Sequence, residues 1–142
     1  MVEEKEISVV IPVYNAAACI KKLIGEVHAT LESQHIPFEI IVVDDNSKDN
    51  SWQIVKDTCA QLSNTKAFLL ARNFGQHKAT LCGFHNCSGR YIITIDDDFE
   101  HEPKDILKIY NQLKESNGDV VYAMPANIKK SFFRRMTARF YK

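Results

Sequence analysis

The sequence lacks a hydrophobic run long enough to cross a membrane, and its few cysteines form no recognisable pattern. No stretch approaches the roughly 18 apolar residues of a membrane span. The start, MVEEKEISVV, has neither the basic beginning nor the apolar centre of a secretory signal. The four cysteines include no C-x-x-C pair, so a reducing compartment is the simpler interpretation. We therefore expect a cytoplasmic protein.

Two common nucleotide-binding motifs are also missing. Neither G-x-G-x-x-G after an apolar run nor G-x-x-x-x-G-K-[ST] occurs, which disfavours dinucleotide-binding dehydrogenases and P-loop enzymes. Cys82, His85 and Cys87 have side chains that zinc can use, but no second pair of ligands accompanies them. We therefore interpret them as buried thiols and a histidine at a helix end.

The composition is that of one domain with an uneven distribution of charge. With 142 residues, 45% of them hydrophobic, the chain is long enough for one core. Basic and acidic residues number 18 each, yet residues 129–142 contain six basic side chains and no acidic one. Such a segment favours an anionic partner or surface. We divide the chain into a main domain, residues 1–124, and a basic segment, residues 125–142.

Apolar runs alternate with helical patterns along the chain. Strands are predicted at residues 7–11, 39–43, 67–71, 91–95 and 119–123, and helices at residues 18–33, 51–62, 76–85 and 104–115. The strand runs are continuously apolar, which is typical of a parallel sheet covered on both faces. The predicted fold class is therefore α/β, with a doubly wound, mostly parallel sheet and helices on both faces.

Acidic residues follow the fourth predicted strand, in the stretch YIITIDDDFEHEP. Asp96, Asp98 and Glu100 alternate, so in an extended segment they would share a face and could offer oxygen ligands to Mg²⁺ or Mn²⁺. Alternatively, the acids could solvate the strand end and favour the N-terminus of the next helix. These residues alone leave both interpretations open.

Two other predicted strands end in polar loops at the same edge of the sheet, where doubly wound folds bind ligands. Asp44 and Asp45 end the second strand, and a carboxylate there could accept a hydrogen bond from a nucleobase or a ribose hydroxyl. It could equally form an Asx turn or a helix cap. Tyr14, after the first strand, could flank a base or close the loop over the core.

Four motifs occur in the order and spacing of a known family: VVIPVYN, EIIVVDDNSKDNS, RNFGQHKATLCGF and GRYIITIDDDFEHEP. Over nearly its whole length the chain resembles the inverting nucleotide-sugar glycosyltransferases of family 2, which have the Rossmann-like GT-A fold. Within that family it is most similar to polyprenyl-phosphate glycosyltransferases, such as dolichyl-phosphate mannose synthases and undecaprenyl-phosphate sugar transferases. The resemblance implies an enzyme that transfers a sugar from a nucleotide sugar to a polyprenyl phosphate, with inversion and with a divalent metal as cofactor.

The resemblance also implies where the nucleotide sugar binds. Pro12, Tyr14 and Asp45 match positions that hold the base and the ribose, and Asp97 is placed with them among the residues that bind the nucleotide sugar. Because RNFGQH resembles the undecaprenyl-phosphate enzymes, a UDP-sugar is preferred over a GDP-sugar as the expected donor.

Around the diphosphate, the resemblance assigns catalysis and metal binding to the acidic loop. Asp96 and Asp98 match the Asp-x-Asp pair of the family, with Asp98 the firmer metal ligand, and Glu100 matches a metal-binding position. Asp97 is commonly alanine in this branch, so its charge is a departure from the pattern. The effect of this charge, on the metal or only on solvation, is left open by the sequence.

The basic segment fits an acceptor at a membrane. As a helix, residues 129–142 would place most of their apolar side chains on one arc, and Arg134 and Arg135 elsewhere, near lipid phosphates. The alternative is a helix that packs on a missing part of the protein. Where the branch often has an arginine, this chain has Pro125. We expect peripheral association with the cytoplasmic face of a membrane.

The resembling enzymes continue beyond the length of this chain, so the sequence predicts a truncated glycosyltransferase domain. One alternative is a module that binds a nucleotide sugar without catalysis. Another is a transferase to a sugar hydroxyl in polysaccharide synthesis, which would require a general base. A lipid phosphate, by contrast, is already anionic and needs no deprotonation. Nucleic acid is not an expected partner, and the oligomeric state is left open.

Overall fold

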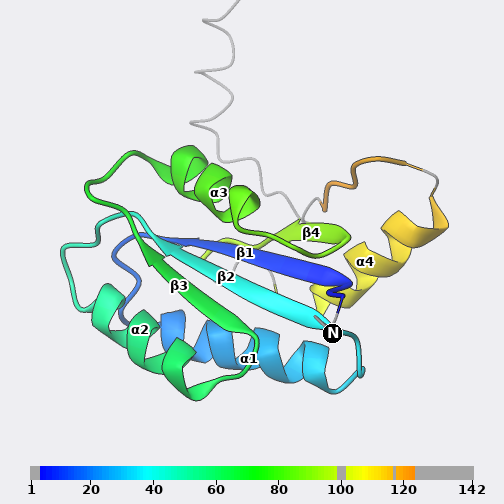
Figure 1. The fold of residues 1–142 in the computed structure, drawn as a ribbon, viewed down its shortest axis with the longest axis horizontal. Helices are drawn as coiled ribbons and strands as arrows, with labels where there is room; N and C mark the ends of the chain where they lie inside the picture. Colours follow the sequence, from blue (N-terminus) through cyan, green and yellow to red (C-terminus); the bar gives the residue numbers. More distant parts are fainter. Residues whose placement is uncertain (1–3, 99–101, 117, 124–142) are drawn as a thin grey trace, which may run out of the picture.

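The computed structural model describes residues 4–98, 102–116 and 118–123, and they form one parallel sheet flanked by helices (Figure 1). The strands are β1 (Ile7–Val13), β2 (Phe38–Asp44), β3 (Thr65–Leu69) and β4 (Tyr91–Thr94). The helices are α1 (Ile20–Glu32), α2 (Ser51–Gln61), α3 (Gln76–His85) and α4 (Asp105–Glu115). The strand order is β3-β2-β1-β4 and every pairing is parallel. The predicted α/β class and the helices on both faces are confirmed.

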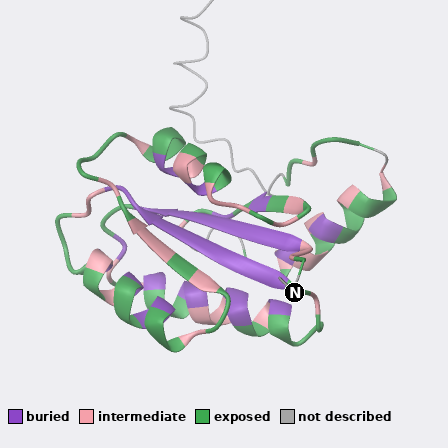
Figure 2. Cartoon of the chain, in the orientation of Figure 1, coloured by how far each residue is buried: buried purple, intermediate pink, exposed green. Residues whose placement is uncertain are grey.

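The two central strands carry the core. Every residue of β1 and β2 is buried, whereas the outer strands are mixed (Figure 2). Because successive strand residues point to opposite faces, Val9 and Ile11 join the cluster on the α1 side, and Val10 joins the smaller cluster with Ala79 of α3. This two-sided burial explains why the central strands are apolar at nearly every position.

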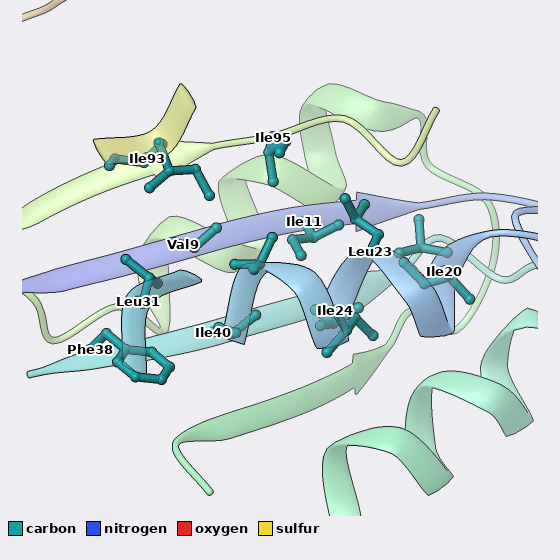
Figure 3. Packing of buried hydrophobic residues seen from close by; sticks show 14 of the residues in the cluster. Val9, Ile11, Ile20, Leu23, Ile24, Leu31, Phe38, Ile40, Ile93 and Ile95 are labelled. Carbon is teal, nitrogen blue, oxygen red and sulfur yellow. The ribbon is translucent and has the colours of Figure 1, made fainter. Parts of the chain in front are cut away.

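Helix α1 covers one face of the sheet with an apolar stripe. Its buried residues are Ile20, Leu23, Ile24, Val27, His28 and Leu31, at the spacing of one helix face. Figure 3 shows Leu23, Ile24 and Leu31 next to strand side chains that include Ile11 and Ile40. The opposite face is covered by α3, which lies over β1 and β2 (Figure 1). The sheet edge that carries the loops is thereby held between two helical layers.

Strand β1 runs two residues further than the sequence predicts and includes Pro12. The Val13 carbonyl accepts a hydrogen bond from the Asp45 N–H on the β2 side, so the backbone nitrogen of Pro12 points to the β4 side. Pairing with β4 ends at Val10 opposite Thr94. Pro12 therefore removes no bond from the ladder, because its missing N–H lies beyond the end of β4.

The predicted fifth strand at residues 119–123 is wrong. Residues 118–123 are described and contain no strand, and Val120 and Tyr122 are 64% and 87% exposed. An apolar run forms a strand only where a neighbouring strand supplies hydrogen-bond partners. Within the described ranges the sheet ends at β4 on the side next to β1, and no further strand pairs with it. The predicted segment at residues 125–142 lies outside the described residues. No described helix is both long and apolar enough to span a bilayer.

Candidate functional site

A cleft of about 310 Å³ opens at the carboxyl ends of β1, β2 and β4, where the start of α3 faces them. Its lining comes from three strand ends and one helix start: Pro12, Val13, Tyr14, Asp45, Asn73, Gly75, Gln76, Ala79, Asp96, Asp97 and Asp98. The structure thus brings together Pro12, Tyr14, Asp45 and the aspartates 96–98, the described residues to which the resemblance assigns nucleotide or metal binding. Their individual roles stay predictions. Glu100, Arg134 and Arg135 lie outside the described residues.

Asp45 is buried at the end of β2 and is only 2% exposed. Its Oδ1 accepts a hydrogen bond from the Phe74 N–H at 2.7 Å, and its Oδ2 accepts one from the Gly75 N–H at 2.8 Å. Both oxygens are therefore engaged by the turn before α3. Each oxygen can still accept a second hydrogen bond, so this geometry is compatible with a contact to a bound base or ribose. Asp44, its neighbour, does not line the cleft.

Asp97 joins the loop after β4 to the loop after β1. Its Oδ2 accepts a hydrogen bond from the Tyr14 N–H at 3.0 Å, and its carbonyl oxygen accepts one from the Cys19 thiol at 3.1 Å. The carboxylate is half-buried and points at the backbone rather than out to solvent. Burial is the main cause of a pKa raised above the ordinary value for Asp97, and the Asp98 charge adds to it, whereas the Tyr14 N–H opposes it.

The thiol of Cys19 is kept protonated by its surroundings. Burial raises its pKa, and the negative charges of Asp97 and Asp98 raise it further. A thiol with a raised pKa remains a hydrogen-bond donor at neutral pH. Cys19 lies at the N-cap of α1. Its hydrogen bond therefore connects that helix to the acidic loop, in addition to the contact between Asp97 and Tyr14.

Asp96 accepts a hydrogen bond from α3, the helix whose start faces the strand ends across the cleft. Gln76 is the first residue of α3, and its side chain donates a hydrogen bond from Nε2 to Asp96 Oδ1 at 2.6 Å. Asp96 and Asp98 are both exposed and line the cleft. Their carboxylate oxygens are of the type that Mg²⁺ and Mn²⁺ prefer. Within the described residues, however, no three His, Cys, Asp or Glu side chains are grouped closely enough to hold a metal ion.

The polar stretch after β2 supports the loop after β1. The Asn15 N–H donates to Ser47 Oγ at 2.9 Å, and Asn15 Oδ1 accepts from the Lys48 N–H at 2.8 Å. The Ala17 N–H donates to Asp49 Oδ2 at 3.1 Å. Although burial acts to raise it, hydrogen bonds hold the pKa of Asp49 below its ordinary value. These contacts hold in place the loop that follows the cleft residue Tyr14.

Five cleft residues were not singled out as site residues from the sequence: the apolar Val13 and Ala79, and also Asn73, Gly75 and Gln76. The last three belong to the motif RNFGQH, which was used only for the resemblance. One signal could have found them, because this motif joins a predicted strand to a predicted helix and so reaches the same edge of the sheet as the acidic loop.

Known proteins are similar to this chain in sequence and in fold. The profile of glycosyl transferase family 2 matches residues 8–141. An undecaprenyl-phosphate 4-deoxy-4-formamido-L-arabinose transferase of Pseudomonas fluorescens (strain SBW25) is 39% identical over 134 residues, which are 94% of this chain and 39% of that protein. The chain therefore spans about two fifths of the length of this relative.

Solved structures agree with the fold. S. aureus TarS in complex with UDP-GlcNAc superposes with a TM-score of 0.64 and 27% identity, over 89% of this chain and 38% of that one. A mannosyltransferase of Pyrobaculum calidifontis, solved with GDP-Man and Mn²⁺, has the same fold, with a TM-score of 0.63 and 19% identity over 79% of this chain and 33% of that one. On the profile match, which covers nearly the whole sequence, the chain belongs to glycosyl transferase family 2.

Proposed function

We propose that this chain is the donor-binding part of a metal-dependent glycosyltransferase that moves a sugar from a UDP-sugar to a polyprenyl phosphate, with inversion. One observation carries the proposal: the cleft has Pro12, Tyr14 and Asp45 on one side and the acidic residues 96–98 on another. The undecaprenyl-phosphate transferase of P. fluorescens, at 39% identity, supports the acceptor. TarS with its UDP-GlcNAc supports a uridine donor.

In this proposal the nucleoside binds at the ends of β1 and β2. Pro12 and Tyr14 line the cleft there, and Tyr14 is 41% exposed, so its ring is available to a base. Asp45 accepts from the base or the ribose while it keeps the turn at Phe74 and Gly75 in place. The diphosphate then lies toward the acidic loop, where Asp97 holds the Tyr14 backbone.

A divalent cation fits the acidic loop because three consecutive carboxylates repel one another and offer hard oxygen ligands. Asp96 and Asp98 would hold Mg²⁺ or Mn²⁺, together with Glu100. When bound, the ion neutralises the charge that develops on the leaving diphosphate. Asp96 and Asp98 are exposed in the cleft, whereas Asp97 is half-buried and accepts from the Tyr14 backbone, so the ligands assigned to the ion are the outer two aspartates rather than the middle one.

The acceptor is proposed to approach from a membrane surface. A phosphate monoester is anionic near neutral pH and can attack the anomeric carbon without a general base. Arg134 and Arg135 are proposed to contact its phosphate, and the basic residues 129–142 to contact anionic lipid. The protein would then associate peripherally with the cytoplasmic face of the membrane.

Calorimetric titration of UDP and GDP, with and without Mn²⁺, tests the donor site. We expect UDP to bind in the presence of Mn²⁺, more tightly than GDP, and Asp98→Ala to abolish the metal-dependent part. Asp57→Ala is the matched control, because Asp57 is an exposed carboxylate on α2, away from the cleft, bonded to Gln53. A folded chain that binds neither nucleotide would contradict the proposal.

Transfer is tested separately, with a panel of UDP-sugars and a polyprenyl phosphate in vesicles. Formation of a lipid-linked sugar supports the full proposal. Metal-dependent UDP binding without transfer to any acceptor, also in a context free of truncation, would indicate a donor-binding module instead. Transfer to a sugar hydroxyl but not to the lipid phosphate would contradict the proposed acceptor.

A further inference from the structure

The turn before α3 is fixed by side chains on both of its sides. Gly75 has a φ of 91°, in the left-handed region that favours glycine. Its N–H donates to Asp45 Oδ2 and also to Asn73 Oδ1, at 2.8 and 3.1 Å. The preceding Phe74 N–H is held by the other oxygen of Asp45. Because two consecutive N–H groups bind one buried carboxylate, the backbone has a single orientation where the helix begins.

The first turn of α3 continues from this fixed point. The Gly75 carbonyl accepts hydrogen bonds from the N–H groups of Lys78 and Ala79, at 2.9 and 3.2 Å. Ala79 is fully buried and packs against Val10 of β1 and Ile41 of β2. The helix start is therefore anchored to the sheet on one side and to Asp45 on the other, and this sets the position of the Gln76 side chain.

We infer that Gln76 is a positioning residue that orients Asp96 toward the bound nucleotide and metal. This inference rests on the proposed function. Gln76 Nε2 donates to Asp96 Oδ1 at 2.6 Å, across 20 residues of sequence. Among the described residues none donates a hydrogen bond to Asp96 Oδ2, so this oxygen is available to a ligand. A lysine or arginine in this place would cancel the charge of Asp96. The neutral amide of Gln76 holds the carboxylate without cancelling that charge, so Asp96 still attracts a cation.

The residues around Asp96 make an orienting partner necessary. Asp97 and Asp98 follow directly, and like charges so close push each other toward solvent. Asp97 is restrained by Tyr14, and Gln76 restrains Asp96 in the same way. Partners that orient metal-binding side chains are typically worth about 10- to 100-fold in metal affinity. Because this hydrogen bond is exposed to solvent, we expect a value near the lower limit.

The hydrogen bond itself can be tested without metal or nucleotide. The side-chain amide of Gln76 gives its own ¹⁵N–¹H signals in NMR spectra of the metal-free chain. We expect Asp96→Asn to shift these signals and to leave those of Gln53 unchanged. Gln53 is the internal control, because its amide donates to Asp57 on α2, far from the cleft. Unchanged Gln76 signals in a folded Asp96→Asn chain would overturn the inference.

Mn²⁺ titration in the presence of saturating UDP tests the functional consequence. Gln76→Ala should weaken Mn²⁺ binding by about tenfold in the wild-type background and have no further effect in an Asp96→Ala background. Its Tm should stay unchanged, because the side chain is exposed and the helix is anchored by Gly75 and Ala79. Equal effects in both backgrounds, or none in either, would overturn the positioning role.

The two proposals fail differently. If the wild-type chain binds no Mn²⁺ with UDP, the proposed function fails and the positioning role fails with it, even where the NMR signals show the hydrogen bond. If the wild-type chain binds both and Gln76→Ala binds them equally well, only the positioning role fails.

Discussion

The carboxylate of Asp97 accepts a hydrogen bond from the backbone N–H of Tyr14 at 3.0 Å, and this contact joins two loops that are 83 residues apart in the sequence. An alanine at this position could not make the contact. The extra acid thus has a structural partner inside the cleft. It keeps the end of β1 next to the acidic loop.

Replacing Asp97 by alanine should loosen this connection. We expect the free energy of unfolding to fall by about 1 kcal/mol, because a hydrogen bond to a charged but partly exposed acceptor is lost. Urea denaturation followed by tryptophan fluorescence measures the change. Asp97→Asn is the matched control, since its amide oxygen can still accept from Tyr14. An Asn variant as unstable as the Ala variant would argue against the hydrogen bond as the cause.

The stability of the domain should depend on pH through Glu39, at the opposite end of the sheet from the cleft. Glu39 is 2% exposed and accepts hydrogen bonds from Ser8, Ser88 and Lys66. Burial alone would raise its pKa, but these partners lower it to about 2. Because the folded chain binds this proton less readily than the unfolded chain does, the stabilisation is present above pH 4.5 and is lost as the pH falls toward 2.

Glu39→Gln should therefore cost more stability at neutral than at acidic pH. The shift in pKa corresponds to roughly 3 kcal/mol at pH 7. The variant also places an amide NH₂ near donors such as the Ser88 N–H. Urea denaturation of both proteins at several pH values between 7 and 2.5 measures the difference. A gap between wild type and variant that stays constant over this range would contradict the assigned pKa.

A third prediction separates Asp45, which we assign to the nucleoside, from Asp98, which we assign to the metal. Asp45→Asn should weaken UDP binding with and without Mn²⁺. The amide oxygen can replace only one of the two carboxylate oxygens that accept from Phe74 and Gly75, and the NH₂ group cannot accept, so the turn shifts. Asp98→Ala should abolish only the metal-dependent part of binding. The expected stability cost for Asp45→Asn is about 1–3 kcal/mol, the cost of an unpaired buried group. Identical metal dependence of the two variants in calorimetry would contradict these separate roles.

Most of the fold was predictable because its signals are local. The apolar runs of β1 and β2 and the periodic stripe of α1 indicate their structure without knowledge of neighbours. The ends of the outer strands were less predictable, because pairing decides them. Strand β3 begins at Thr65 because Thr65 pairs with Ile40 of β2. The predicted strand at residues 119–123 does not form, and its large side chains Val120 and Tyr122 are exposed.

The position of the site was predictable, but its internal contacts were not. Parallel strands bring their carboxyl ends to one edge, so polar loops after three strands had to meet there. The contacts of Gln76 with Asp96 and of Asp97 with Tyr14 join residues 20 and 83 positions apart. No spacing rule links them, because their approach depends on how α3 and the loops sit on the sheet.

The final prediction concerns the packing of α3, which carries Gln76. A Cβ atom on Gly83 would overlap Cγ1 of Val10 and would also lie 3.2 Å from its Cγ2. Val10 is fully buried and β-branched, so it cannot rotate away. Gly83→Ala should therefore destabilise the domain by about 1–3 kcal/mol, and the double variant with Val10→Ala should lose less than the sum of the single effects.

Gly25→Ala is the matched control for this substitution. Gly25 lies inside α1, and nothing is within 4 Å of a Cβ placed there. Alanine should stabilise that helix by roughly 0.5–1 kcal/mol, because glycine loses more conformational freedom on folding. Thermal and urea denaturation should therefore give opposite signs for the two substitutions. If Gly25→Ala were destabilising, or Gly83→Ala neutral, the space around the added Cβ would not explain the effect of alanine at these two positions.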